Sequence, residues 1–166
     1  MWQHVSDERD EQMIHVEILT AESPLVSMDV DSVVATTIDG QVAILHGHMP
    51  FVAVLQPGEL VLRLSRGDLY YSISGGFLRV SAIGVSVLAD ACEYAEAIDV
   101  ERAEQARRRA EALLAEGKPG VDLVAGEAAL RRALARLHVA DRHRVRTQPR
   151  AMRMERATLH RDHADI

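Results

Sequence analysis

LYYSISGGFLRVSAIGVSVLA (residues 69–89) contains three short apolar runs that are separated by two glycine-containing turns. The runs cover residues 69–74, 77–81 and 85–89, and the turns fall at Gly75-Gly76 and Ile83-Gly84. Within the runs the residues show a period of two and many are β-branched, which is typical of strands with one buried face. Turns at this close spacing predict a β-sandwich or a β-barrel.

The same pattern extends upstream to Met13. Further runs with strand character cover residues 14–19, 32–38, 42–45, 51–55 and 60–64. Turn residues separate several of them, at Asp39-Gly40, Gln56-Pro57-Gly58 and Arg66-Gly67-Asp68. We therefore expect an all-β domain over residues 13–90. Residues 1–12 are polar and acidic, and we expect them outside the fold, as a disordered extension, an upstream start or a remnant of an expression vector.

Beyond Ala89 the composition shifts to Ala, Glu, Arg and Leu, and the apolar period lengthens to that of a helix. Asp99 is suited to cap a first helix, and the Gly-Lys-Pro-Gly sequence at 117–120 is suited to end it. A second helix is expected from Asp122 to about Arg144, giving an antiparallel hairpin over residues 91–144. Residues 145–166 predict a disordered basic tail. The fold class is α+β, mainly β followed by α: an N-terminal β-sandwich with a C-terminal antiparallel two-helix hairpin.

Composition excludes several classes of function. The chain has 166 residues, of which 48% are apolar, and it lacks an apolar run of the roughly 20 residues that a membrane-spanning helix needs. Only 4% of the residues are aromatic, so a base-stacking surface for nucleic acid is not expected. The single cysteine, Cys92, excludes an internal disulfide and a multi-cysteine metal site, and we expect a cytosolic protein.

The charge is divided unevenly along the chain. Residues 1–100 carry 4 basic and 15 acidic residues, whereas residues 101–166 carry 15 basic and 10 acidic residues. A change of sign this sharp suggests that the helical part faces an anionic surface or ligand. A solvated helical face is the alternative interpretation of the same pattern.

No catalytic motif is present. The sequence lacks a phosphate-binding glycine loop, a nucleophile elbow and paired metal-ligand cysteines, so we expect a non-catalytic protein. The His46-Gly47-His48 sequence offers two metal-ligating side chains without a third nearby, and a structural loop is favoured over a metal site. Cys92 has no cationic neighbour in sequence and is expected to be a buried structural thiol.

Four arginines of the predicted hairpin are spaced for a common site. Arg102 and Arg109 lie two turns apart on the first helix, and Arg132 and Arg136 lie one turn apart on the second. Guanidinium groups bind phosphate oxygens in bidentate fashion, so this set suits a polyphosphate. The alternative is that each arginine pairs with a local carboxylate, namely Glu101, Glu104, Asp122 or Glu127.

Three segments together carry a resemblance to a known family. They are Asp31-Ser32-Val33-Val34, the stretch GQVAILHGH at residues 40–48, and Ser74-Gly75-Gly76-Phe77, followed by the alanine- and arginine-rich hairpin. Over residues 13–144 the sequence resembles the epsilon subunit of bacterial F-type ATP synthase. It departs from the usual family pattern at Val42-Ala43 and at His46, so the loop is expected to contact its partner differently.

The resemblance implies a rotor subunit. The sandwich is then expected to bind the gamma subunit and the c-subunit ring, with partner contacts near Gly40, Ile44, His46, Gly47 and His48. The hairpin is expected to fold against the sandwich or to extend into the alpha/beta catalytic head, where it inhibits ATP hydrolysis. The implied location is peripheral, at the cytoplasmic face of the bacterial plasma membrane, within a proton-translocating complex and without membrane insertion.

The resemblance also implies a regulatory nucleotide site in the hairpin. Ile98-Asp99-Val100-Glu101-Arg102-Ala103 matches the family's Ile/Leu-Asp-x-x-Arg-Ala motif. The nucleotide-binding residues expected from this match are Glu93, Ile98, Asp99, Arg102, Ala103, Arg109, Arg132 and Arg136. ATP is expected as a signal that stabilises the folded hairpin, with no required cofactor and with the Mg²⁺ requirement left open. The competing hypothesis is a stand-alone nucleotide-sensing or adaptor protein.

Overall fold

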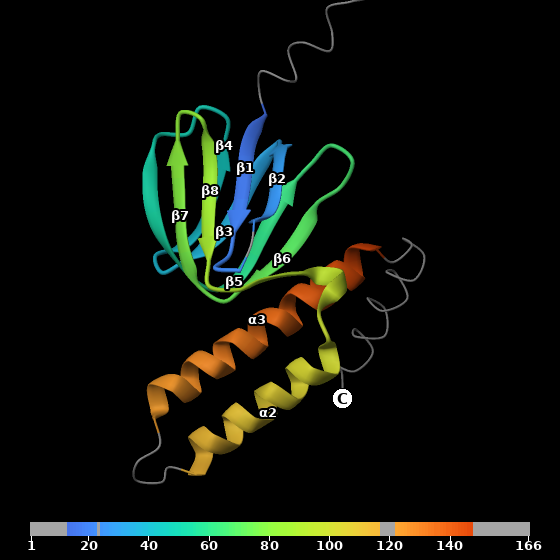
Figure 1. Cartoon of the computed structure of the whole chain (residues 1–166). Coiled ribbons are helices and arrows are strands. Elements are labelled where there is room, and N and C mark those ends of the chain that lie inside the picture. Colours follow the sequence, from blue (N-terminus) through green and yellow to red (C-terminus); the bar gives the residue numbers. More distant parts are fainter. Residues whose placement is uncertain (1–12, 23, 117–121, 148–166) are drawn as a thin grey trace, which may run out of the picture.

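The computed structural model describes residues 13–22, 24–116 and 122–147. The predictions for residues 1–12, for the stop at 117–120 and for the tail from 148 onward lie outside this part. A β-domain is followed by two helices (Figure 1). The strands are β1 (Ile14–Leu19), β2 (Pro24–Val30), β3 (Ser32–Thr37), β4 (Gly40–Leu45), β5 (Phe51–Arg63), β6 (Leu69–Ile73), β7 (Gly76–Ser81), β8 (Gly84–Ala89) and β9 (Cys92–Tyr94).

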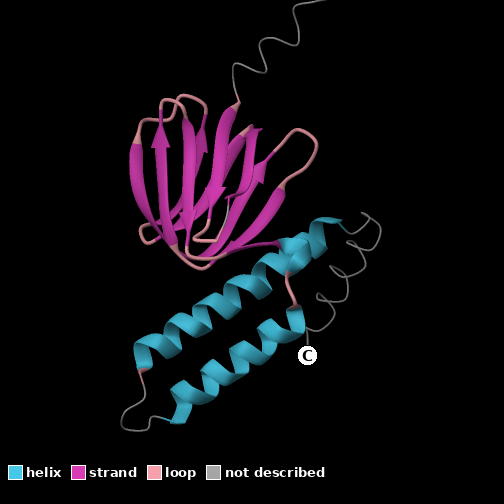
Figure 2. Cartoon of the chain, in the orientation of Figure 1, coloured by secondary structure: helices cyan, strands magenta, loops and turns pink. Residues whose placement is uncertain are grey.

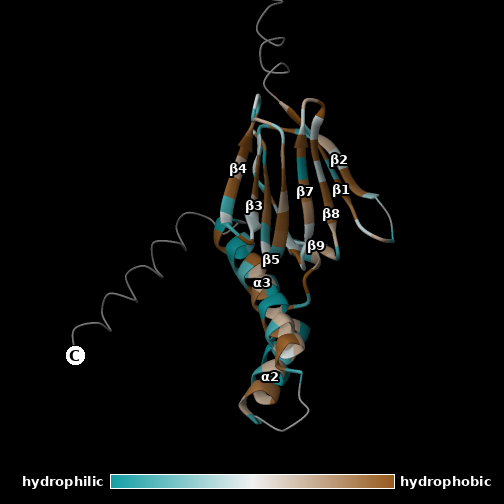
Figure 3. Ribbon diagram, turned by 90° about the vertical axis from the view of Figure 1, so that its left-hand side faces the viewer, coloured by the Kyte–Doolittle hydropathy of each residue, from teal (hydrophilic) through white to brown (hydrophobic). Residues whose placement is uncertain are grey.

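The strands form two layers that are joined through β5. The main path of hydrogen-bonded neighbours is β2-β1-β8-β7-β5-β3-β4, with β6 pairing with β5 and β9. The first half of β5 pairs with β7, and its second half pairs with β6, so this strand passes from one layer to the other. Figure 3 shows the layers edge on, with β3 and β4 in one and β1, β2, β7 and β8 in the other. The predicted β-sandwich followed by helices is thus confirmed.

Three details of the predicted strands are wrong. Residues 51–63 form one continuous strand, because Gln56-Pro57-Gly58 lies where β5 crosses between layers and makes no reversal. β2 was not predicted, although Val26, Met28 and Val30 alternate with the exposed Ser27 and Asp29. β9 was not predicted either, because it has only three residues; it extends the sheet to Tyr94, into the segment assigned to the hairpin domain.

The sandwich core lies between the two layers. It is built almost wholly from aliphatic side chains of alternating strand positions, and Val16, Leu60 and Leu78 are among those with no exposed surface. At the turn between the core strands, Gly76 has a φ of +123°, and a Cβ there would lie 2.0 Å from the carbonyl oxygen of Leu88. Only glycine fits this position, which explains one glycine of the 74–77 motif.

The two helices begin where the sequence places their caps. A short 3-10 turn, η1 (Ala95–Ala97), precedes α2 (Val100–Glu116) and α3 (Leu123–Thr147). Asp99 and Asp122 each accept a backbone hydrogen bond through Oδ1, from Arg102 N at 2.9 Å and from Ala125 N at 3.0 Å. α3 runs to Thr147, three residues beyond the predicted end, because contacts of Arg146 with the sandwich hold its last turn.

The hairpin is folded against one end of the sandwich (Figures 1 and 2). α3 packs on β5 and β6, and α2 packs on the side of α3 that faces away from the sheet. A second, smaller apolar cluster fills the space between the outer face of the sheet and α3. Its buried members are Val34, Val61, Tyr70, Ala95, Ile98 and Val139.

Candidate functional site

A cleft of about 370 Å³ lies between the end of the sandwich, the start of α2 and the middle of α3. Three of the four arginines of the predicted polyphosphate site line it, and they come from both helices. The lining residues are Glu93, Ala97, Asp99, Arg102, Ala103, Ala106, Arg109 and Arg136. Six of the eight residues expected to bind nucleotide therefore surround a single cleft.

The cleft has an excess of cationic groups. Arg136 donates from Nε and Nη2 to Glu93 Oε1, at 2.8 and 2.6 Å, so it joins α3 to β9. Neither Arg102 nor Arg109 has an ion-pair partner within the described residues. Two guanidinium groups thus stay available at the cleft, beside a third whose carboxylate partner is partly exposed.

The other two residues expected to bind nucleotide, Ile98 and Arg132, do not line this cleft. Ile98 is 7% exposed and belongs to the apolar cluster under α3, so it positions the start of α2 rather than lining the cleft. Arg132 lines a separate cleft of about 390 Å³, together with Gly75 and Asp90 of the sandwich. In this folded state the structure does not bring Arg132 to the other three arginines.

Local ion pairs occur on other arginines than the four predicted. Arg107 pairs with Glu104 and Glu111 on α2, and Arg131 pairs with Glu127 on α3 at 3.5 Å. The alternative interpretation, in which local carboxylates occupy the arginines of the polyphosphate site, is therefore not seen for the four predicted residues in the described part of the chain. Helical spacing distinguishes these two groups, because Arg107 and Arg131 each have a glutamate three or four residues away. Among the four predicted residues, Arg109, Arg132 and Arg136 have no carboxylate at that spacing.

A second candidate surface lies at the end of the sandwich remote from the helices. The His46-Gly47-His48 loop and the β7–β8 turn border a hollow of about 440 Å³ there. Leu45, Met49 and Ile83 are 59%, 78% and 84% exposed, so apolar side chains face solvent. No group of three or more metal-ligating side chains gathers among the described residues, and both histidines contact backbone carbonyl oxygens through Nδ1.

The five residues expected to contact a partner do not form one patch. Thr37 pairs with Gly40 and Ser32 pairs with Leu45, so Gly40 lies at the opposite end of the β3–β4 hairpin from the histidine loop. Ile44 is 1% exposed and is part of the sandwich core. Its side chain is therefore unavailable to a partner in this structure, and only the loop at 46–48 is well placed.

An exposed apolar row, which was not predicted, crosses the outer face of the layer that contains β7 and β8. Val54 lies opposite Phe77, and Phe77 lies opposite Leu88, with Val52 on the same face of β5. The exposed fractions of these four side chains range from 41% to 66%. The signal in the sequence was the presence of apolar residues on both faces of β5, β7 and β8, which a sandwich with one solvated face does not need.

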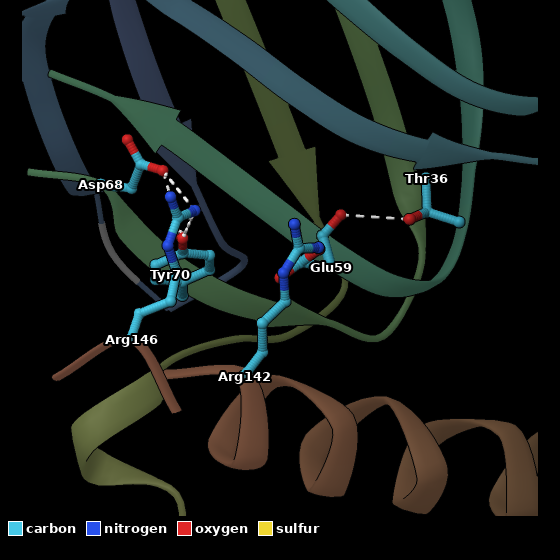
Figure 4. Close-up of polar contacts among 6 residues, drawn as sticks. All are labelled: Thr36, Glu59, Asp68, Tyr70, Arg142 and Arg146. Carbon is cyan, nitrogen blue, oxygen red and sulfur yellow. Dashed lines mark hydrogen bonds and ion pairs between the residues drawn. The ribbon is translucent and has the colours of Figure 1, made fainter. Parts of the chain in front are cut away.

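Polar contacts between α3 and the sandwich were also not predicted. Arg142 bonds to Glu59, and Arg146 bonds to Asp68 at 2.9 Å and to the Tyr70 hydroxyl (Figure 4). Both guanidinium groups also lie 5.8 Å from the centre of the Tyr70 ring. Burial is the main cause that raises the pKa of Tyr70 above its ordinary value of 10.0, which keeps the phenol neutral. Sequence separations of 76 to 83 residues hide such pairs from pattern analysis.

The position of Cys92 is that predicted for a structural thiol. It lies in β9 and packs against the sandwich core. Burial, with a smaller contribution from Glu93, raises the pKa of its thiol to about 12. A thiol that stays protonated at neutral pH is a poor nucleophile.

The fold defines a β-sandwich protein with exposed apolar surfaces and an appended helical hairpin that packs against it. Residues 13–95 match the family model described as the ATP synthase delta/epsilon chain β-sandwich domain, and residues 96–141 match that of its long α-helix domain. The chain belongs to the ATP synthase delta/epsilon chain family. The family match confirms the family predicted from the sequence and the prediction that the subunit is not catalytic. It does not support the alternative hypothesis of a stand-alone nucleotide-sensing or adaptor protein.

Individual relatives agree with this assignment. The sequence is 46% identical to an ATP synthase epsilon chain of Herpetosiphon aurantiacus, over 80% of this chain and 98% of that one. It is 44% identical to an ATP synthase epsilon chain of Dehalococcoides mccartyi, over 81% of this chain and 97% of that one. A chain of the Euglena gracilis mitochondrial ATP synthase, in a structure of OSCP, F1 and c-ring, aligns with a TM-score of 0.68 at 27% identity, covering 77% of this chain and 81% of that one.

Among the described helices, none is both long enough and apolar enough to cross a bilayer.

Proposed function

We propose that this chain is the epsilon subunit of an F-type ATP synthase, in which the sandwich anchors it in the central stalk and the hairpin restrains ATP hydrolysis. The observation that carries the proposal is the contrast between the two domains. The sandwich has its own core, whereas the hairpin is attached by a small apolar cluster and a few ion pairs. Such an attachment suits an element that leaves and returns.

The two exposed surfaces of the sandwich are assigned to the rotor. The apolar row of Val52, Val54, Phe77 and Leu88 is suited to dock on the gamma subunit, because such a contiguous exposed patch marks a protein interface. The histidine loop with Leu45, Met49 and Ile83 is suited to contact the c-subunit ring at the remote end. In this proposal the subunit lies peripherally at the membrane, on the side of the catalytic head.

The cleft in the hairpin is assigned to ATP acting as a regulatory ligand. Arg102 and Arg109 of α2 and Arg136 of α3 converge on it, so a polyphosphate bound there contacts both helices. A ligand that requires this convergence binds the folded state better than the extended one, and therefore shifts the population towards the folded hairpin. In the extended state, α2 and α3 reach the alpha/beta catalytic head and block hydrolysis.

Hydrolysis by the matching catalytic complex tests the assignment. The complex is stripped of this subunit and receives either the full chain or a chain that ends at Ala97, with binding of each measured by co-sedimentation. We expect both chains to bind and only the full chain to suppress hydrolysis. Failure of both to bind contradicts the rotor assignment, and suppression by the shortened chain contradicts the role of the hairpin.

Calorimetric titration with ATP tests the nucleotide site in the isolated chain. Arg102→Ala and Arg109→Ala each remove a charge-assisted bond, which is worth about 1.5–3 kcal/mol, so affinity falls by about tenfold or more. Arg108→Ala is the matched control, because Arg108 is exposed on the same helix and does not line the cleft. Equal effects of Arg102→Ala and Arg108→Ala contradict the site. Arg132→Ala lowers affinity only if ATP draws Arg132 across from its separate cleft.

A further inference from the structure

Glu59 is a buried carboxylate at the contact between the sandwich and α3. On β5, the neighbouring Leu60 and Leu62 face the sandwich core, whereas Val61 belongs to the cluster under α3. Glu59 shares the face of Val61, so its side chain points towards the helix. That side chain is only 4% exposed although it stands on the outside of the sheet. Its burial is therefore a consequence of the folded hairpin.

The carboxylate is only half satisfied. Oε2 accepts a bond from Arg142 Nη1, and within the described residues Oε1 is buried without any hydrogen-bond partner (Figure 4). Thr36 is close by, but its hydroxyl donates to the backbone carbonyl of Glu59 instead, at 3.2 Å. A buried charge that lacks part of its hydrogen bonding opposes the state that buries it.

The neighbouring polar contact differs in this respect. Asp68 accepts bonds through Oδ2 from both Arg146 and Tyr70, and the Arg146 side chain is 48% exposed. Its carboxylate keeps several partners in the folded state. Glu59 and Asp68 both face α3, but among the described residues only Glu59 has a carboxylate oxygen that is buried without a hydrogen-bond partner.

We propose that Glu59 is a release element, which keeps the folded hairpin weakly held and makes its docking conditional on Arg142. When α3 leaves, both carboxylate oxygens regain water, so the carboxylate favours the extended hairpin. When α3 docks, Arg142 offsets part of the desolvation cost. The mobility of the hairpin rests on the proposed function, whereas the effect of Glu59 on docking is a property of this chain alone.

The test measures the accessibility of a thiol beneath α3 in the full chain. Val34→Cys places the thiol in the apolar cluster under the helix, and Cys92→Ala removes the native one. At low concentration of a thiol reagent, the labelling rate is proportional to the fraction of chains with an open hairpin. Glu59→Met, Glu59→Gln, Arg142→Met and the double variant Glu59→Met/Arg142→Met are compared in this background, and circular dichroism confirms that each variant is folded.

We expect Arg142→Met to raise the labelling rate by about tenfold or more, because it leaves a buried carboxylate unpaired. Glu59→Met and Glu59→Gln are expected to lower the rate at least about threefold, since replacing a buried ion-pair partner by an uncharged side chain removes the desolvation cost. In the Glu59→Met background, Arg142→Met is expected to change the rate by less than about threefold. Arg107→Met is the control, because its ion pairs lie within α2, and it is expected to leave the rate unchanged.

Two outcomes overturn the inference. If Glu59→Met and Glu59→Gln open the hairpin or leave it unchanged, Glu59 does not oppose docking. If Arg142→Met has the same effect with and without Glu59, the two side chains are not coupled. Adding the Glu59→Met chain to the stripped complex gives an independent readout. Weaker suppression of hydrolysis is expected there, and unchanged suppression alongside the expected labelling rates contradicts the inhibitory role of the hairpin while leaving the release element in place.

Discussion

The two apolar clusters of this chain differ in what surrounds them. The sandwich core is enclosed by hydrogen-bonded strands on both sides and consists almost entirely of aliphatic residues. The cluster under α3 contains only a few buried residues, and it is bordered by Glu59, Asp68 and the arginines of the helix. One cluster therefore holds a domain together, and the other attaches a movable element to it.

This difference decides which substitutions unfold the protein and which only release the hairpin from the sandwich. Loss of apolar area in the sandwich lowers the free energy of global unfolding, because every strand depends on that core. Loss of area under α3 lowers only the free energy of docking the hairpin. Because the buried apolar area under α3 is small, the folded and extended states of the hairpin are close in free energy. The charged residues around this cluster then shift the equilibrium between them.

The largest effect is expected from Leu78→Ala in the sandwich. Leu78 has no exposed surface, and its removal leaves a cavity among strands from both layers. Substitutions of this kind cost about 2–5 kcal/mol of unfolding free energy. Denaturant unfolding followed by circular dichroism measures the loss. A change below about 1 kcal/mol contradicts the view that this cluster is the core on which the domain depends.

Val139→Ala tests the other cluster. Val139 is fully buried between α3 and the outer face of the sheet. Loss of two buried methyl groups costs about 1–2 kcal/mol, and we expect this cost in hairpin docking rather than in the unfolding of the sandwich. Thiol labelling at Val34→Cys accelerates by about tenfold, while the unfolding midpoint of the β-domain stays the same. An equal loss in both measurements contradicts the independence of the two clusters.

Alkaline pH is expected to weaken the helix–sandwich contact. Tyr70 is buried there, and burial raises the pKa of its phenol in the folded state. The neutral phenol is thus favoured by folding, so its stabilisation is complete below pH 10 and is lost as the pH rises through the raised pKa. The rate of thiol labelling, corrected for the ionisation of the thiol, follows this change. Ultraviolet titration of the chain and of its Tyr70→Phe variant follows the ionisation of Tyr70 itself. A Tyr70→Phe chain with the same pH dependence assigns the loss to other groups.

Local patterns predicted most of the fold. Alternating apolar residues and glycine turns located six strands, and Asp99 and Asp122 located both helix starts, because these signals depend on residues close in sequence. Gln56-Pro57-Gly58 was misinterpreted as a reversal because its role depends on pairing partners, namely β7 before it and β6 after it. A crossing between layers and a turn carry the same local composition.

The candidate site was predictable only in part. The spacing of Arg102 and Arg109 placed them on one face of α2, and the structure brings Arg136 to the same cleft. The partners of Arg136 and Arg142 are Glu93 and Glu59, which lie 43 and 83 residues away in sequence. Such pairs depend on how α3 crosses the sheet, and one helical sequence offers several faces for that crossing.

The smallest effect is expected from Arg131→Gln, which sharpens the distinction between exposed and buried charges on α3. Arg131 pairs with Glu127 one turn away, and their side chains are 56% and 60% exposed. Exposed helix pairs contribute about 0.3–0.5 kcal/mol, because solvent screens the charges and both side chains lose conformational freedom. The rate of thiol labelling beneath the hairpin should change by less than about twofold. The free energy of unfolding should change by less than about 0.5 kcal/mol. Arg142→Met carries the same loss of one positive charge from α3 and has the larger expected effect. If both variants open the hairpin equally, the net charge of the helix controls docking, and the burial of Glu59 does not.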